Sequence, residues 1–175
     1  MALTFLTCAL TDVDQLRAVA MRCYTPYYAH LWEEGGLEQY LASTYSTERL
    51  VAELSDPNVY YELALHHGVA VAFSKSVRHC DQAPIMNAAY LERVYVVPDM
   101  LGHRVGQALI ERVIKRAHRD GRTRVWLQAM AEASAPLRRY RELGFTVCGS
   151  TTLVQPSVRA DLTAMHILVK DLSHP

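Results

Sequence analysis

Two glycines, Gly102 and Gly106, lie in the segment PDMLGHRVGQ (residues 98–107), between a β-branched run and an amphipathic helical pattern. Because glycine has no Cβ, its backbone can come close to a ligand. The N–H groups at a helix start, with the positive end of the helix dipole, bind anions such as phosphate. The segment therefore indicates a pyrophosphate cradle, although its spacing matches neither G-x-x-x-x-G-K-[ST] nor G-x-G-x-x-G, and a glycine-bearing turn is also a common plain connection.

Regular elements must hold this segment, and hydrophobic periodicity predicts where they are. Val105, Leu109 and Val113 recur at helical spacing, and Gly121 stands where a glycine commonly ends a helix. Strand patterns occupy residues 3–10, 59–67, 69–78, 88–97, 124–130, 146–155 and 161–172. Helical patterns occupy residues 11–24, 37–44, 46–54, 105–120 and 135–144. This order of elements predicts a mixed α/β domain.

The composition is typical of one globular domain over residues 1–175, because half of the chain is hydrophobic. Lys plus Arg and Asp plus Glu number 18 each, so the charge favours neither nucleic acid nor a membrane surface as partner. The four cysteines include no C-x-x-C pair, and no Cys or His pair has metal-ligand spacing. The N-terminus lacks a signal-peptide pattern. We expect a cytoplasmic protein without a metal or a membrane segment.

Three motifs in order resemble the GNAT acetyltransferase superfamily: V-x-V-x-P at residues 94–98, LGHRVGQAL at 101–109 and PLRRYRELGF at 136–145. The segments YLASTYSTERLVAELSDPNVYYELAL, LERVYVVP, WLQAMAE and DLTAM resemble more narrowly the bacterial PaiA-type group of spermidine/spermine N-acetyltransferases and their relatives. The resemblance covers nearly the whole chain. It implies the GNAT fold, a central, mostly antiparallel twisted sheet of about seven strands flanked by about four helices and splayed at the fourth and fifth strands.

The resemblance also implies that acetyl-CoA is the cofactor and CoA the product. The end of the fourth strand would contact the pantetheine arm through its backbone, with the Val96 amide facing the thioester carbonyl; its residues are Val94, Tyr95 and Val96. The pyrophosphate would lie on residues 102–107, which are Gly102, His103, Arg104, Val105, Gly106 and Gln107.

Three positions depart from the family pattern. Leu101 replaces the usual Arg or Gln that opens the loop, and Arg104 replaces a glycine often found in its middle. Ala133 stands where relatives carry an asparagine that bonds the pantetheine, and we expect the neighbouring Ser134 to substitute for it. The backbone N–H groups that make up most of the cradle are unaffected by these changes.

An amine that attacks a thioester needs a base, an oxyanion site and an acid for the leaving thiolate. The resemblance implies that Tyr140 is this acid, a role open to a phenol with a pKa of about 10; the alternative is a tyrosine packed on the sheet. Glu92 is the candidate base, the alternative being an ordinary paired acid with water carrying the proton. Strand alternation predicts Glu92 on the face of Tyr90 and Val94, opposite Arg93.

Residues of the early helices are the candidates for substrate binding. Glu33 and Glu34, in HLWEEGG, would hold a cationic amine where the superfamily builds its substrate wall, or would be ordinary exposed loop acids. Tyr28, in CYTPYYAHLW, either lines the substrate pocket with its neighbouring tyrosines or packs the first helix.

These inferences predict an acetyl-CoA-dependent N-acetyltransferase that acts on the primary amine of a small molecule, such as a polyamine-like amine, by direct attack in a ternary complex. One alternative is a peptide or protein N-terminal acetyltransferase, which needs an open groove. Another is a CoA-binding regulatory module without turnover, an alternative that Ala133 and the uncertain base favour and Tyr140 opposes. The strand patterns at residues 146–155 and 163–172 would leave a sheet edge that can pair with a second copy or be covered, so the sequence allows a homodimer without requiring one.

Overall fold

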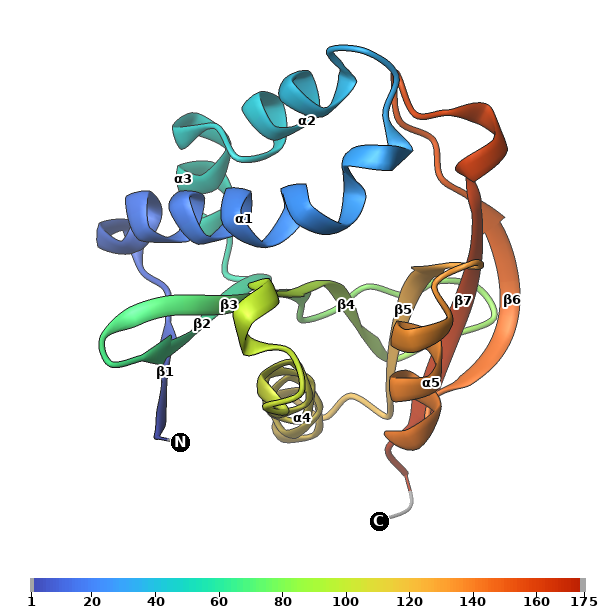
Figure 1. The fold of residues 1–175 in the computed structure, drawn as a ribbon. Coiled ribbons are helices and arrows are strands. Elements are labelled where there is room, and N and C mark those ends of the chain that lie inside the picture. Colours follow the sequence, from blue (N-terminus) through green and yellow to red (C-terminus); the bar gives the residue numbers. More distant parts are fainter. Residues whose placement is uncertain (1, 174–175) are drawn as a thin grey trace.

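The computed structural model describes residues 2–173 as one seven-stranded sheet covered by helices on both faces (Figure 1). The strand order is β1-β2-β3-β4-β5-β7-β6, and every neighbouring pair is antiparallel except β4–β5. The strands are β1 (Leu3–Thr7), β2 (Val59–His66), β3 (Val69–Val77), β4 (Ala88–Val96), β5 (Arg124–Met130), β6 (Thr146–Thr152) and β7 (Ala164–Asp171). The described residues form five α-helices: α1 (Val13–Tyr28), α2 (Gly36–Thr44), α3 (Thr47–Ser55), α4 (Val105–Arg119) and α5 (Ser134–Glu142).

Local sequence signals account for these boundaries. Ser46 caps α3 by accepting a hydrogen bond from the Arg49 amide, and Gly121 follows α4 in the left-handed conformation that glycine tolerates best. The β2–β3 hairpin turns at His67 and Gly68, both at positive φ. The predicted order of strands and helices is confirmed, with shifts of one to a few residues at most ends.

Two buried clusters hold the layers together. One lies mainly between α1–α3 and the first four strands, and its largest fully buried side chains include Tyr45, Tyr61 and Phe73. The other joins α4 and α5 to β4 and β5 around Leu127 and Phe145. Figure 1 shows α1, α2 and α3 on one face of the sheet and α4 on the other. Each large apolar side chain stabilises the fold by about 1.5–3 kcal/mol when it is fully buried.

The feature that creates a site is the divergence of β4 from β5. Their parallel pairing runs only from Ala88↔Arg124 to Leu91↔Leu127, while β5 stays paired with β7 as far as Met130↔Met165. Beyond Leu91, β4 therefore continues without a neighbour on its β5 side. The expected splay at the fourth and fifth strands is confirmed.

Candidate active site

Two cavities meet where β4 and β5 separate. The first, of about 340 Å³, is called here the aromatic cavity because Tyr24, Trp32 and Tyr40 are among its walls. The second, of about 580 Å³, is called the loop cavity and extends to Leu101 in front of α4. Both are lined by seven common residues, Tyr28, Leu31, Val94, Tyr95, Met130, Ala133 and Pro136. A ligand in one cavity can therefore meet a ligand in the other beside Val94 and Tyr95.

The turn before α4 offers free backbone donors at the end of the loop cavity. Arg104 is the N-cap residue of α4, its side chain makes no capping hydrogen bond, and the first turn contains no acid. Because the first amides of a helix have no intrahelical partner, the N–H groups of Val105, Gly106 and Gln107 are available to an anion. Gly102 has φ +80, and a Cβ added there would meet nothing within 4 Å, so the turn is open to a ligand. These features fit a pyrophosphate.

The free side of β4 supplies a second set of backbone groups. Val97 donates its amide to Val71 on β3, and strand alternation then directs the amides of Val94 and Val96 away from β3. On that side β4 has no strand partner after Leu91. An extended amide-bearing ligand, such as a pantetheine arm, can hydrogen-bond here as a strand would. Val94 and Val96 both line the loop cavity.

Tyr140, on α5, lines the aromatic cavity. Its ring packs edge-on against Phe145 with the centroids 5.9 Å apart, which explains the spacing between this tyrosine and the Gly-Phe pair at the helix end. Burial, followed by the nearby Tyr28, raises the pKa of the Tyr140 phenol. The phenol is therefore protonated at neutral pH, as a proton donor must be.

A β-bulge changes the predicted direction of Glu92. The register between β3 and β4 shifts at Lys75 and Ser76, which pair with Arg93 and Leu91, so Glu92 is the extra residue. Nη1 of Arg93 lies 2.9 Å from Oε1 of Glu92, and Lys75 Nζ lies 2.9 Å from Oε2. The prediction that Glu92 and Arg93 lie on opposite faces is therefore wrong, because the bulge interrupts the alternation.

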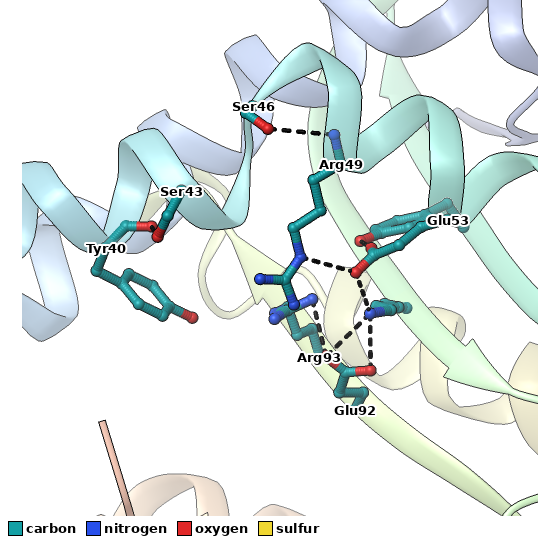
Figure 2. A network of polar contacts seen from close by, with 9 residues as sticks. Tyr40, Ser43, Ser46, Arg49, Glu53, Glu92 and Arg93 are labelled. Atoms are coloured by element: carbon teal, nitrogen blue, oxygen red, sulfur yellow. Dashed lines mark hydrogen bonds and ion pairs between the residues drawn. The ribbon is translucent and has the colours of Figure 1, made fainter. Parts of the chain in front are cut away.

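Glu92 belongs to a charged cluster between α3 and β4. Figure 2 shows Arg49 and Glu53 extending from α3 toward Glu92 and Arg93. Lys75 lies between the two carboxylates, with Nζ 2.9 Å from Glu53 Oε1, and its side chain is only 6% exposed. A carboxylate whose oxygens already contact Lys75 and Arg93 is poorly placed to take a proton from an amine.

Seven of the described residues that line the aromatic cavity are aromatic, and sequence reasoning had favoured packing for the tyrosines of α1. Tyr24 and Tyr28, one turn apart on α1, lie 4.8 Å apart between ring centroids, and Tyr95 meets both edge-on. Tyr28 thus lines the cavity, which is the first of the two alternatives that the sequence left open for it. Tyr24, one of its neighbouring tyrosines, lines the cavity as well. Further lining residues that the sequence did not reveal are Trp32, Tyr40, Arg93, Gln128, Met130, Leu153, Val154 and Gln155. The spacing of Tyr24 and Tyr28 marks a shared helix face but does not say what that face covers.

Apart from the turn 102–107, which follows Leu101 and itself lines neither cavity, three predicted binding residues lie outside the cavities. Glu33 and Glu34 are exposed and line neither cavity, because the chain there turns outward between α1 and α2. Ser134 is the exposed first residue of α5, whereas Ala133 lines both cavities. The structure therefore does not bring these polar groups to the β4–β5 splay.

The segment after β6 joins the α1–α2 connection beside the aromatic cavity. Trp32 forms an isolated β-bridge with Val158, the Glu33 amide donates to the Ser157 carbonyl at 2.9 Å, and the Arg159 amide donates to the Leu31 carbonyl at 2.8 Å. Both segments contribute cavity walls, from Leu31 and Trp32 on one side and residues 152–155 on the other. These contacts close one side of the cavity.

Within residues 2–173, no helix has the length and apolar character needed to cross a bilayer. The same residues contain no group of three or more His, Cys, Asp or Glu side chains arranged to hold a metal ion.

Comparisons with known proteins agree with this geometry. The family model described as "Acetyltransferase (GNAT) family" matches residues 13–145. An uncharacterized N-acetyltransferase of Mycobacterium tuberculosis is 27% identical over 143 residues, which cover 82% of this chain and 88% of that protein.

Two solved structures show the same fold. The PaiA N-acetyltransferase from Thermoplasma acidophilum, solved in complex with coenzyme A, matches with a TM-score of 0.79 and 20% identity over 98% of this chain and 99% of that one. The ribosomal-protein-S18-alanine N-acetyltransferase from Escherichia coli matches with a TM-score of 0.72 and 18% identity over 99% and 96%. The agreement extends over nearly the whole of each chain.

Proposed function

Since this chain belongs to the GNAT family of acetyltransferases, which use acetyl-CoA, we propose that it transfers the acetyl group to the primary amine of a small molecule. The amine would attack the thioester directly within a ternary complex, without a covalent enzyme intermediate. The observation that carries this proposal is the meeting of two cavities at the β4–β5 splay, one beside free helix amides and the other enclosed by aromatic side chains.

The chain's own groups suit acetyl-CoA in two places. The turn Gly102, His103, Arg104, Val105, Gly106 and Gln107 would hold the pyrophosphate through its free amides, with Arg104 adding a positive charge. Val94, Tyr95 and Val96 would hold the pantetheine arm, with the Val96 amide at the thioester carbonyl. The Val96 amide supports this assignment because it lies on the unpaired side of β4. We keep Ser134 as a weaker candidate, since it lines neither cavity.

Tyr140 is the proposed proton donor to the leaving thiolate. Its phenol lines the aromatic cavity, and burial raises its pKa and so keeps it protonated. Glu92 is the acid nearest to this chemistry, but Lys75 and Arg93 already engage its oxygens. A water molecule held by Glu92 or by a tyrosine is therefore the better candidate to receive the proton of the amine.

A small acceptor is favoured over a peptide by the contacts that close one side of the aromatic cavity. A peptide needs an open groove, whereas Trp32 pairs here with Val158 and Glu33 with Ser157. We propose a cytoplasmic enzyme, in keeping with four cysteines that are all free thiols. Pairing of two copies through the edge strand β6 stays a prediction.

The first experiment measures thermal stabilisation by acetyl-CoA and by CoA, then thiol release across a panel of amines. Stabilisation with turnover on a small amine, and little turnover on peptides, is the expected result. Preferred turnover of peptide N-termini would overturn the small-acceptor proposal. Stabilisation without turnover on any acceptor would favour a non-catalytic CoA-binding module.

A further inference from the structure

Arg93 is a buried cation whose donors are not satisfied by the protein. Its side chain is 9% exposed and lines the aromatic cavity. A guanidinium carries five N–H donors, yet within residues 2–173 Arg93 makes no side-chain hydrogen bond, and its Nη1 is buried without a hydrogen-bond partner. Its contacts are a Coulombic one with Glu92 at 2.9 Å and the face of the Tyr45 ring, 5.7 Å from its centroid. Buried polar groups normally have partners, so this exception needs a cause.

The charge balance of the surrounding cluster points the same way. Three cations, Arg49, Lys75 and Arg93, face two carboxylates, Glu53 and Glu92. Glu53 is engaged by Arg49 and Lys75, and both oxygens of Glu92 by Lys75. Since the two carboxylates are already contacted without Arg93, the positive charge left over is that of Arg93.

The one carboxylate among the described residues that line the aromatic cavity is Glu92, and Lys75 already contacts both of its oxygens. Among the described lining residues, Glu92 and Arg93 are the only charged side chains, and Glu92 is already paired. A polyamine would bring further positive charge beside Arg93, where like charges repel. An anionic group on the acceptor would meet the guanidinium of Arg93, whose Nη1 has no hydrogen-bond acceptor in the protein.

The geometry points to Arg93 as the group that binds a carboxylate of the acceptor, so that the substrate is a small amino carboxylate. This inference rests on the proposed acetyltransferase function and names its substrate class. Arg93 stands three residues before Val96 on β4, about 10 Å along the strand. One small molecule with an amine at one end and a carboxylate at the other can bridge between Val96 and Arg93.

Matched pairs of acceptors test this inference. The pairs are phenylalanine with phenethylamine, lysine with cadaverine, and γ-aminobutyrate with propylamine, together with spermidine. We expect the wild-type kcat/KM to be about 10- to 100-fold higher for the carboxylated member of at least one pair, the range given by one charge-assisted hydrogen bond. The preference should disappear in Arg93→Met and persist in Arg49→Met, a matched control whose arginine belongs to the same cluster but lines neither cavity.

A binding measurement separates this inference from the proposed function. Thermal stabilisation of the CoA-bound protein by 3-phenylpropionate, which has a carboxylate but no amine, needs no turnover; it should be lost in Arg93→Met and kept in Arg49→Met. If no acceptor is acetylated, the proposed function fails while this measurement still decides the role of Arg93. Equal or better turnover of the decarboxylated amines or spermidine, unchanged in Arg93→Met, would overturn the inference, as would carboxylate binding that does not depend on Arg93.

Discussion

Replacing Lys75 with methionine tests how the charged cluster stabilises the fold. The Lys75 side chain is 6% exposed, and its Nζ lies 2.9 Å from one oxygen of Glu53 and 2.9 Å from one of Glu92. Methionine fills much of the space but leaves the two partly buried carboxylates facing each other. Removing one partner of a buried pair costs about 3–5 kcal/mol, which lowers Tm by about 6–20 °C in a domain of this size.

The matched change Arg93→Met gives the comparison, measured by urea unfolding and by thermal scans of the ligand-free protein. Without Arg93 the cluster still has two cations, Arg49 and Lys75, for two carboxylates, so we expect a change in unfolding free energy within about 1 kcal/mol. Adding Glu53→Gln to Lys75→Met should recover part of the lost stability, because one unpaired carboxylate is removed. Equal losses for Lys75→Met and Arg93→Met would refute the reasoning, since they would mean that Arg93 is as necessary to the fold as Lys75.

Four further results are expected. Tyr140→Phe should lower kcat by about 100-fold or more, with the affinity for acetyl-CoA retained. Full activity of this variant in steady-state kinetics would rule out Tyr140 as the acid. Burial alone would raise the pKa of Glu53, but hydrogen bonds from Tyr61 and Lys75 hold that pKa below its usual value. The ionised Glu53 therefore contributes its full stabilisation of the fold above about pH 4.3, and this contribution is lost as the pH falls through the lowered pKa. Urea midpoints across that range should therefore fall less steeply in Glu53→Gln than in the wild type. In Gly36→Val the new Cβ would lie 2.7 Å from the Cβ of Ser157, which should separate the α1–α2 connection from the segment after β6 beside the aromatic cavity. We expect kcat/KM for the acceptor to fall by about 10- to 100-fold, while thermal stabilisation by CoA is unchanged. Arg104 has φ 58, so Arg104→Gly should relieve about 1 kcal/mol of backbone strain and raise Tm by about 2–4 °C; a lowered Tm would contradict this strain argument. Because the substitution removes a positive charge, it should also weaken CoA binding in titrations at low salt.

The sequence predicted the elements of this fold because their signals are local. Helical spacing from Val105 onward and Gly121 marked α4, and β-branched runs marked β4 and β5. The turn at residues 102–107, which we propose to bind the pyrophosphate, was also visible, because a glycine pair before an amphipathic helix is a contiguous pattern. At Arg104 the sequence showed only a missing glycine, and the structure adds that the arginine takes the left-handed conformation there.

The site itself depends on contacts between distant segments. Alternation along β4 wrongly placed Glu92 and Arg93 on opposite faces, because the bulge opposite Lys75 and Ser76 depends on the pairing of two strands. From the sequence, the tyrosines of α1 could either pack in the core or line a pocket. The structure shows that Tyr24 and Tyr28 line the aromatic cavity, because α1 lies over the β4–β5 splay.

By itself, the sequence determined the order of the elements and the turn that suits a pyrophosphate, since periodicity, capping and glycine conformations act over a few residues. Only the tertiary structure decided which side chains line the aromatic cavity. Glu33 and Glu34 point outside the cavities, whereas Arg93 is buried in the wall of one of them without a hydrogen-bond acceptor of its own. Burial and charge pairing are properties of the packed chain, and neither can be read from spacing along it.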